Sequence, residues 1–380
     1  MRIQWKWLAL GAAAFIASSA SAQELVVRIG HVAATSGNWA HWGRDNEMGA
    51  RMAIDELNAQ GLLIGGKKAR FELLTEDDAG DPRQATAVAQ KLVDSGVNGV
   101  VGHLNSGTSI PASRIYSDAG IPQIAPSVTN PKFTRQGYAT TFRVVADDVQ
   151  LGNVLGRYAA VTLQSRAIAV IDDRTAYGQG LAQEFEKDAV AAGGKLVSRQ
   201  YTTDKATDFS AILTAVKAAK PDIVFFAGGD SQAGPMLRQM KQLGLNVKFM
   251  GGDGVCTTDL PRLAGGAIAD NQVVCAVAGG VEGAQKKRFD DFRAAFKAKF
   301  GVEVQAYGPN AYDSVKLMAA AMAQAGSADP AKYLSALART EGYAGVSGMI
   351  SFDSKGDLKN GALTLFTFKG GNRAELAIVR

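Results

Sequence analysis

The sequence predicts an α/β protein of two doubly wound lobes, each built on a parallel sheet. Its 380 residues are more than one compact domain usually holds and suit two. From residue 25 onwards, short β-rich runs alternate with amphipathic helical patterns, which is typical of repeated βαβ units. The alternation restarts after residues 142–145. Because repeated βαβ units form parallel sheets covered by helices on both faces, two such series indicate two lobes.

The first 22 residues have the three parts of a secretion signal. Arg2 and Lys6 supply a short positive region, residues 7–17 are apolar, and residues 20–22 are small. The apolar part is about half as long as a membrane span. We therefore expect cleavage near Ala22 and a periplasmic protein, with an N-terminal anchor helix as the alternative. No cysteine ends the apolar run, so a lipid anchor is not expected.

The first series of elements opens with a β-rich run at residues 25–32. Residues 50–57 place alanine, isoleucine and leucine on one helix face, and Gly61 ends that helix. Asp81 caps the next helix, which has Pro82 in its first turn. Further strands are predicted at residues 71–75, 97–101 and 121–125, with a helix through residues 110–115.

The second series continues the same alternation to the end of the chain. Phenylalanines at helical spacing across residues 289–300 predict the packing face of a helix rather than a cofactor site. Another helix is expected through residues 312–318. Strands are predicted at residues 142–145, 167–171, 196–201, 222–227, 247–251, 349–352 and 363–368, and helices at residues 209–217 and 234–243.

Composition and charge exclude several classes of protein. The formal net charge is +5, and losing Arg2 and Lys6 with the signal leaves 39 basic against 36 acidic residues. The basic residues are scattered, so no nucleic-acid partner is expected. The rest of the chain has no long uncharged apolar stretch, which argues against an integral membrane protein.

Motifs for catalysis, metals and cofactors are missing from the sequence. It contains no GxxxxGK[ST] phosphate loop, no GxSxG elbow and no HExxH, and the dinucleotide pattern begun at Gly178 fails at Gln183. Three scattered histidines and two cysteines show no metal-ligand spacing. We therefore expect no catalytic residues, no metal and no cofactor. In an oxidising compartment, Cys256 and Cys275 are expected to be bridged rather than free.

Four loops that follow predicted strands combine hydroxyls, aromatic rings and acids. They are residues 36–43, 102–108, 125–129 and 172–180. Ligands of doubly wound sheets bind beyond the carboxyl ends of the strands, so these loops are the candidate site. Hydroxyls at helix starts are either caps or part of a carboxylate site, and both readings stay open.

The first and fourth loops also carry aromatic rings. Trp42 is expected to form a ligand wall, whereas Trp39 is equally well explained as a buried structural ring. Tyr177 either closes the site from the second lobe or packs beneath its own loop.

With these loops the chain resembles the branched-chain amino-acid-binding proteins of ABC importers, the leucine/isoleucine/valine-binding type. The resemblance covers nearly all of the chain after the signal. It rests on Asp77-Asp78-Ala79-Gly80-Asp81-Pro82, Gly102-His103-Leu104, Tyr177-Gly178-Gln179-Gly180, Phe249-Met250-Gly251 and Phe352-Asp353-Ser354-Lys355-Gly356-Asp357-Leu358, in this order and spacing.

The resemblance implies a type I periplasmic binding protein fold, with two lobes joined by three crossovers. The crossovers are expected near Val145, Ala276 and Ile350. The expected division is residues 23–145 and 277–350 for lobe 1, and residues 146–276 and 351–380 for lobe 2.

The resemblance also implies roles for particular residues. In the family, a hydroxyl and backbone groups of the first lobe hold the ligand's α-carboxylate, in loops that match Ser106 and Ser127-Val128-Thr129. Trp42 matches an aromatic position, and Tyr177 matches a tyrosine that reaches in from the second lobe. The acid for the ligand's α-ammonium falls on Asp253.

The chain departs from the family pattern at two places. Asp230 stands where leucine-type proteins have a tyrosine, and it is expected either to bind the ammonium, to select an extra polar group, or only to cap a helix. Gly80 and Asn105 stand where some relatives have a disulfide, so these two loops must be held together without one. Cys256 and Cys275 are expected to provide a different link.

The resemblance implies a protein that binds and does not catalyse. The lobes are expected to close over one amino acid, branched-chain or other small neutral, and to deliver it to membrane-embedded ABC permease subunits. A monomer is expected. The alternative is the same fold with another ligand, namely an amide, urea or an aromatic acid. A transcriptional regulator would need an N-terminal DNA-binding motif, where this chain carries an export signal.

Overall fold

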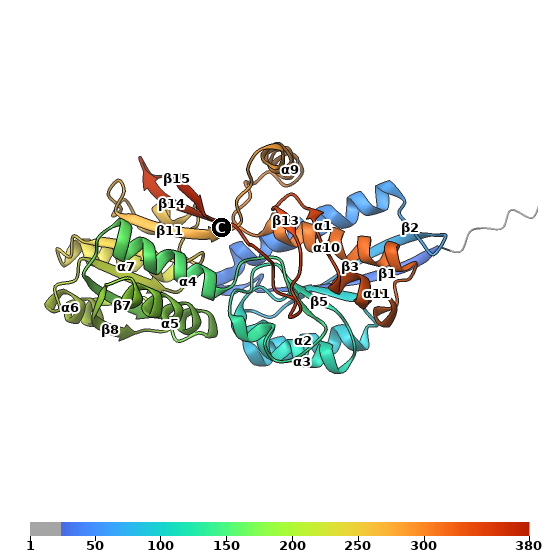
Figure 1. The fold of residues 1–380 in the computed structure, drawn as a ribbon, viewed down its shortest axis with the longest axis horizontal. Coiled ribbons are helices and arrows are strands. Elements are labelled where there is room, and N and C mark those ends of the chain that lie inside the picture. The colour runs from blue at the N-terminus through green and yellow to red at the C-terminus, as the bar shows by residue number, and fades with distance from the viewer. Residues whose placement is uncertain (1–23, 380) are drawn as a thin grey trace, which may run out of the picture.

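The computed structural model describes residues 24–379, so the predicted secretion signal and its cleavage site lie outside the described residues. Two large sheets, each covered by helices, form two lobes that lie side by side (Figure 1). The prediction of a two-lobed α/β protein is confirmed.

The first sheet has the order β2-β3-β1-β4-β5-β6 and is parallel except for the short β2 at its edge. Its strands are β1 (Leu25–Ala33), β2 (Leu63–Ile64), β3 (Lys67–Asp77), β4 (Gly99–Gly102), β5 (Gln123–Ala125) and β6 (Thr141–Arg143). Its helices are α1 (Ala40–Gln60), α2 (Pro82–Asp94), α3 (Ser106–Asp118), α10 (Gly308–Ala325) and α11 (Pro330–Ala338).

The predicted helix boundaries of this lobe have the expected causes. Gly61 follows α1 in the left-handed conformation, with φ +65°. The Asp81 side chain accepts hydrogen bonds from the backbone N–H groups of Arg83 and Gln84 at the start of α2. Although 247 residues lie between the end of α1 and the start of α10, the two helices pack side by side, as Figure 1 shows. Late segments of the chain therefore complete the first lobe.

The second sheet has the order β15-β14-β11-β10-β9-β7-β8. Its strands are β7 (Ala167–Asp172), β8 (Lys195–Tyr201), β9 (Ile223–Ala227), β10 (Lys248–Gly251), β11 (Val273–Ala278), β14 (Leu363–Lys369) and β15 (Asn372–Val379). Its helices are α4 (Asp148–Arg157), which a π-helical turn (Tyr158–Thr162) extends, α5 (Ala176–Ala191), α6 (Ser210–Ala218), α7 (Asp230–Gln242) and the short α8 (Leu260–Leu263).

This second sheet is mixed, whereas the sequence predicted a parallel one. Strand β14 runs antiparallel to both β11 and β15. The turn at Gly370 and Gly371, both with positive φ, joins β14 to β15 as a hairpin and explains the pairing of these two strands. A connection this short permits only antiparallel pairing.

One more helix and two short strands lie between β11 and β14 in the chain, besides α10 and α11. Helix α9 (Ala284–Phe300) stands above the rest in Figure 1, and the short strands β12 (Tyr343–Ala344) and β13 (Met349–Ile350) pair with each other. Phe292 and Phe296 of α9 are buried against Met52, so the predicted packing role of the phenylalanine stripe is confirmed.

The chain passes between the lobes three times: after β6, after β11 and after β13. Two details bear on the predicted limits of the lobes. Strand β11 stays in the second sheet to Ala278, and Phe352 still packs on Phe142 of the first lobe, with ring centroids 5.0 Å apart. The residue limits themselves stay a prediction.

Candidate functional site

A cavity of about 350 Å³ lies between the lobes. Every loop that lines it follows the carboxyl end of a parallel strand, which is where ligands of such sheets bind. The first lobe contributes Trp39, Trp42, Gly80, Pro82, Leu104, Asn105, Ser106, Gly107 and Ser127, and the second contributes Arg174, Thr175, Ala176, Tyr177, Asp204, Asp253 and Gly254. The four loops singled out from the sequence therefore meet around one cavity.

Aromatic rings form one wall of this cavity. Trp42 is 4% exposed and meets Trp39 edge to face, with ring centroids 5.7 Å apart. Tyr307 also packs against Trp42, with ring centroids 5.7 Å apart. The Trp42 indole N–H has no hydrogen-bond partner among residues 24–379. The wall is thus apolar, with one buried donor that is unused.

The start of helix α3 forms a polar surface of the cavity, in contrast to the apolar aromatic wall. The side chain of the helix's cap residue, Asn105, accepts from the Thr108 hydroxyl and caps none of the backbone N–H groups, and Ser106 and Gly107 in the first turn line the cavity. The Ser127 hydroxyl donates to the Leu104 carbonyl at 2.6 Å, which fixes the preceding loop. Uncapped N–H groups and the positive end of the helix dipole favour an anion here.

Val128 and Thr129, two of the predicted site residues, do not line the cavity. Both are buried, and their carbonyl oxygens face away from it: that of Val128 accepts from Arg143 at 2.8 Å, and that of Thr129 accepts from the Asp148 N–H at 2.8 Å. In this structure the two residues hold the crossing from β6 to α4 in place behind the site.

Asp253 lines the cavity from the second lobe. Its side chain is 4% exposed and accepts hydrogen bonds from two tyrosine hydroxyls, Tyr177 at 2.6 Å and Tyr307. Burial raises the pKa of the Asp253 carboxyl, and the two tyrosine hydrogen bonds oppose that rise. Burial and the nearby Asp253 raise the pKa of both tyrosines well above the usual value, so both stay protonated donors.

Sequence reasoning missed Asp204, which lines the cavity. It also missed Tyr307, whose hydroxyl donates to Asp253. Tyr307 precedes α10 in a stretch with no recognisable motif, and it reaches Asp253 only because α10 folds back onto α1. The tyrosine just before the proline-containing helix start was the one available signal.

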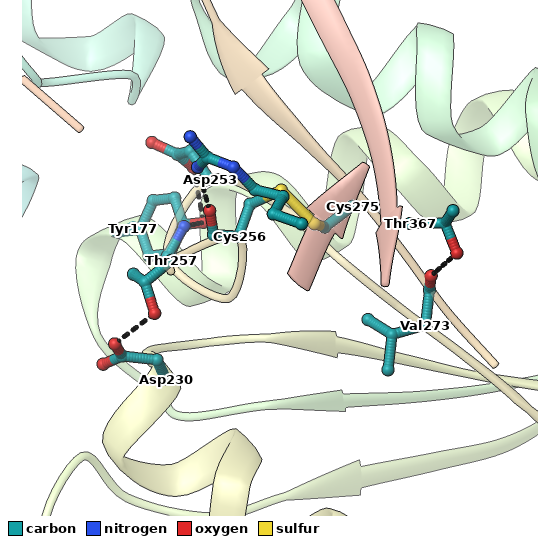
Figure 2. Close-up of a disulfide and its surroundings, with 10 residues drawn as sticks. Tyr177, Asp230, Asp253, Cys256, Thr257, Val273, Cys275 and Thr367 are labelled. Atoms are coloured by element: carbon teal, nitrogen blue, oxygen red, sulfur yellow. Dashed lines mark hydrogen bonds between the residues drawn. A yellow bond between two sulfur atoms is a disulfide. The ribbon is translucent and has the colours of Figure 1, made fainter. Parts of the chain in front are cut away.

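Asp230 lies outside the cavity lining, although its side chain is buried. One of its carboxylate oxygens accepts from the Thr257 hydroxyl at 2.6 Å, which Figure 2 shows, and lies 3.1 Å from His41 Nε2. His41 belongs to the first lobe, so this contact joins the lobes beside the site. Asp230 is the first residue of α7.

Cys256 and Cys275 form a disulfide, as predicted (Figure 2). It links the loop after Asp253 to strand β11, and the Cys256 N–H donates to the Asp253 carbonyl at 3.0 Å. The bridge therefore restrains the backbone that presents the Asp253 carboxylate.

The described part of the chain offers neither a metal site nor a membrane span. Within residues 24–379, no group of three or more histidine, cysteine, aspartate or glutamate side chains is arranged to hold a metal ion. No helix there is both long and apolar enough to cross a membrane.

Comparison with known proteins gives consistent results over the full length. A family model described as "Periplasmic binding protein" matches residues 26–372. The chain is 36% identical to Leu/Ile/Val-binding protein homolog 1 of Brucella abortus (strain 2308), over 94% of each chain. It is 35% identical to the leucine-, isoleucine-, valine-, threonine-, and alanine-binding protein of Pseudomonas aeruginosa, over 99% of this chain and 98% of the relative.

A solved structure agrees with these relatives. The branched-chain amino acid transporter substrate-binding protein LivJ of Streptococcus pneumoniae, in complex with isoleucine, superposes with a TM-score of 0.83 at 27% identity. The match covers 93% of this chain and 98% of that one.

Proposed function

Because this chain belongs to the periplasmic binding protein family, we propose that it captures an amino acid, branched-chain or other small neutral, and delivers it to an ABC permease. The family consists of solute-binding proteins and not of enzymes. The names of the relatives support this ligand class, since they specify leucine, isoleucine and valine, and one of them also threonine and alanine.

One observation carries the proposal: the cavity has opposite electrostatic ends with an apolar wall between them. The open start of α3 suits a carboxylate, and Asp253 on the other lobe suits an ammonium. Trp42 and Leu104 lie between these ends. Burying a zwitterion is costly unless both charges are paired. A cavity with these two ends and an apolar wall therefore selects an α-amino acid with an apolar side chain.

Roles in the site follow from this pose. We assign the α-carboxylate to Ser106 and its neighbouring N–H groups, and the α-ammonium to Asp253 with Tyr177. Ser127 supports the loop before Ser106, and Val128 and Thr129 hold the crossing from β6 to α4 behind the site. Trp42 contacts the side chain of the ligand. Asp230 stabilises the closed form through its contact with His41 and does not contact the ligand. The protein works as a periplasmic monomer after cleavage near Ala22.

The test is an intrinsic fluorescence titration of residues 23–380, stripped of ligand, with each common amino acid, followed by calorimetry. Trp39 and Trp42 are the only tryptophans left after the signal, and both line the cavity. A saturable change with a few apolar amino acids supports the proposal. Calorimetric silence with all of them contradicts it, and the same titration with amides, urea and aromatic acids then tests the alternative.

Two single-residue variants show which tryptophan causes the ligand-dependent change in fluorescence. Trp42→Phe removes the ring that lies deepest in the wall, and Trp39→Phe removes the half-buried ring beside it. We expect the ligand-dependent change to be reduced most in Trp42→Phe, because that ring is sealed from solvent in the structure and contacts the ligand directly in our pose.

A further inference from the structure

Three fully buried side chains lie directly behind the ligand loops of the first lobe. They are Asp78, His103 and Tyr116, each with no exposed surface. Asp78 follows β3, His103 follows β4, and Tyr116 lies in α3. None of them lines the cavity. Gly80, two residues after Asp78, and Leu104, the residue after His103, both do.

The Asp78 carboxylate joins the two loops through separate oxygens. Oδ1 accepts from the Gly80 N–H at 2.9 Å, and Oδ2 lies 2.7 Å from His103 Nδ1. A carboxylate oxygen accepts, so Nδ1 donates. On the far side of the ring, Nε2 lies 3.1 Å from the Tyr116 hydroxyl. The loop after β3 is thereby linked to His103, which directly precedes Leu104, Asn105 and Ser106 in the loop after β4.

The two loops also lie close together at the cavity itself, which both Gly80 and Asn105 line. The neighbouring Asp77 extends the same arrangement, because its Oδ1 accepts from the N–H groups of Thr35 and Ala79, at 3.0 and 2.8 Å. Asp77 and Asp78 together connect the loops that follow β1, β3 and β4.

We propose that Asp78 and His103 are positioning residues, which hold the start of α3 in the place where it binds the ligand's α-carboxylate. The inference rests on the proposed function for the identity of the ligand. A helix start binds an anion through backbone N–H groups, so a small displacement of that loop weakens several hydrogen bonds at once. The buried pair links the two loops by a charge-assisted hydrogen bond, the stronger class of such bonds.

Two substitutions of one residue separate this role from general packing. The amide nitrogen of asparagine falls near the position of His103 Nδ1, whereas that of glutamine reaches the position of Nε2. His103→Asn therefore keeps the donor to Asp78 and loses the contact with Tyr116, and His103→Gln does the reverse. Tyr116→Phe is the matched control, since it removes only the hydroxyl beside Nε2.

Leucine affinity, leucinamide affinity and the melting temperature are measured for all three variants. We expect His103→Gln to weaken leucine binding about tenfold or more, the equivalent of one charge-assisted hydrogen bond. His103→Asn and Tyr116→Phe stay within about threefold of the parent protein. Leucinamide lacks the carboxylate, so its affinity changes less than that of leucine in His103→Gln.

Amide hydrogen exchange of Gly80, Ser106 and Gly107 in the ligand-free protein provides a second readout. Faster exchange in His103→Gln than in His103→Asn supports the positioning role. Equal exchange in the two variants, or affinity losses that follow the melting temperature across all three, would overturn it. If the parent protein binds no amino acid, the proposed function fails, and the exchange rates still decide the positioning role.

Discussion

Tyr307, at the start of α10 in the first lobe, donates its hydroxyl hydrogen bond to Asp253 in the second lobe. The other carboxylate oxygen of Asp253 accepts from Tyr177 of its own lobe. The hydrogen bonding of this acid is thus complete only when the lobes are together. When the lobes separate, the Asp253 carboxylate loses the hydrogen bond from Tyr307 and must accept one from water instead. The hydrogen bonding of Asp253 is therefore coupled to closure of the lobes.

Asp253→Asn is expected to abolish amino-acid binding, with a loss of about 100-fold or more, because the ligand's ammonium loses its buried counter-charge. The ligand-free protein should melt at the same or a higher temperature, since burial already disfavours the charged form of this acid. Calorimetry and thermal melting with and without leucine measure both effects. Full affinity in this variant would contradict the site assignment.

Asp230→Asn is the matched substitution at the other buried acid of the second lobe. It lies outside the cavity lining and contacts His41 and Thr257. We expect a loss of leucine affinity below about tenfold, because only the contact between the lobes changes. A loss as large as that of Asp253→Asn, measured in the same calorimetric titration, would show that Asp230 binds the ligand directly.

Tyr307→Phe keeps the ring against Trp42 and removes the hydroxyl that reaches Asp253. A hydrogen bond to a charged group contributes about 1.5–3 kcal/mol, so leucine affinity should fall about tenfold or more. Tyr312→Phe is the control: its hydroxyl donates to Glu56 at 2.6 Å, away from the cavity. Equal affinities of the two variants in calorimetry would rule out a role for Tyr307 in the closed form.

Replacing both Cys256 and Cys275 by alanine removes the disulfide at the base of the Asp253 loop. Loop-closure entropy predicts a loss of about 3 kcal/mol in the free energy of unfolding for a loop of this length. Urea unfolding measures that loss, and treating the parent protein with a reductant should reproduce it. A stability unchanged by both treatments would indicate that the cysteines are not bridged in solution.

The buried His31 is expected to make the free energy of unfolding fall as the pH falls. Burial lowers its pKa to about 4, and both ring nitrogens lack a hydrogen-bond partner within residues 24–379. The unfolded chain binds a proton near pH 6.5 and the folded protein does not, so stability present above pH 6.5 is lost as the pH falls toward 4. The loss amounts to about 3 kcal/mol.

His31→Leu should flatten this part of the pH profile, because leucine has no proton to bind. Urea unfolding of both proteins at several values between pH 4 and 7 gives the comparison. Glu47, Arg51, Asp78 and His103 also act on His31 electrostatically, and they remain in the variant. Parallel profiles for the two proteins would show that other groups cause the acid sensitivity.

Much of the fold and part of the site were predictable from local signals in the sequence. Asp81 with Pro82 marked the start of α2 and Gly61 marked the end of α1, because capping depends on residues close in the chain. The loops carrying Trp42, Ser106 and Tyr177 were found because strand ends are readable and each loop joins a strand to a helix. Asp253 was found through the resemblance, since a single loop acid has no signature of its own.

What the sequence could not predict depends on contacts between distant segments. Tyr307 meets Asp253 across 54 residues and the gap between the lobes. Asp230 points to His41 rather than into the cavity because Thr257, from the next loop of its own lobe, is there to donate to it. Strand β15 was missed because all of its residues are at least partly exposed and show no clean alternation.

The late return of the chain to both sheets sets the order in which this protein acquires its structure. Helix α10, which packs on α1, begins at Gly308, and β14 and β15 complete the second sheet only from Leu363 onwards. A growing chain that ends before Gly308 leaves the apolar face of α1 uncovered in the first lobe and an open edge at β11 in the second. Neither lobe can therefore be completed before the last fifth of the sequence is present. The last fifth of the sequence then completes both lobes, and with them the cavity, in the same late step.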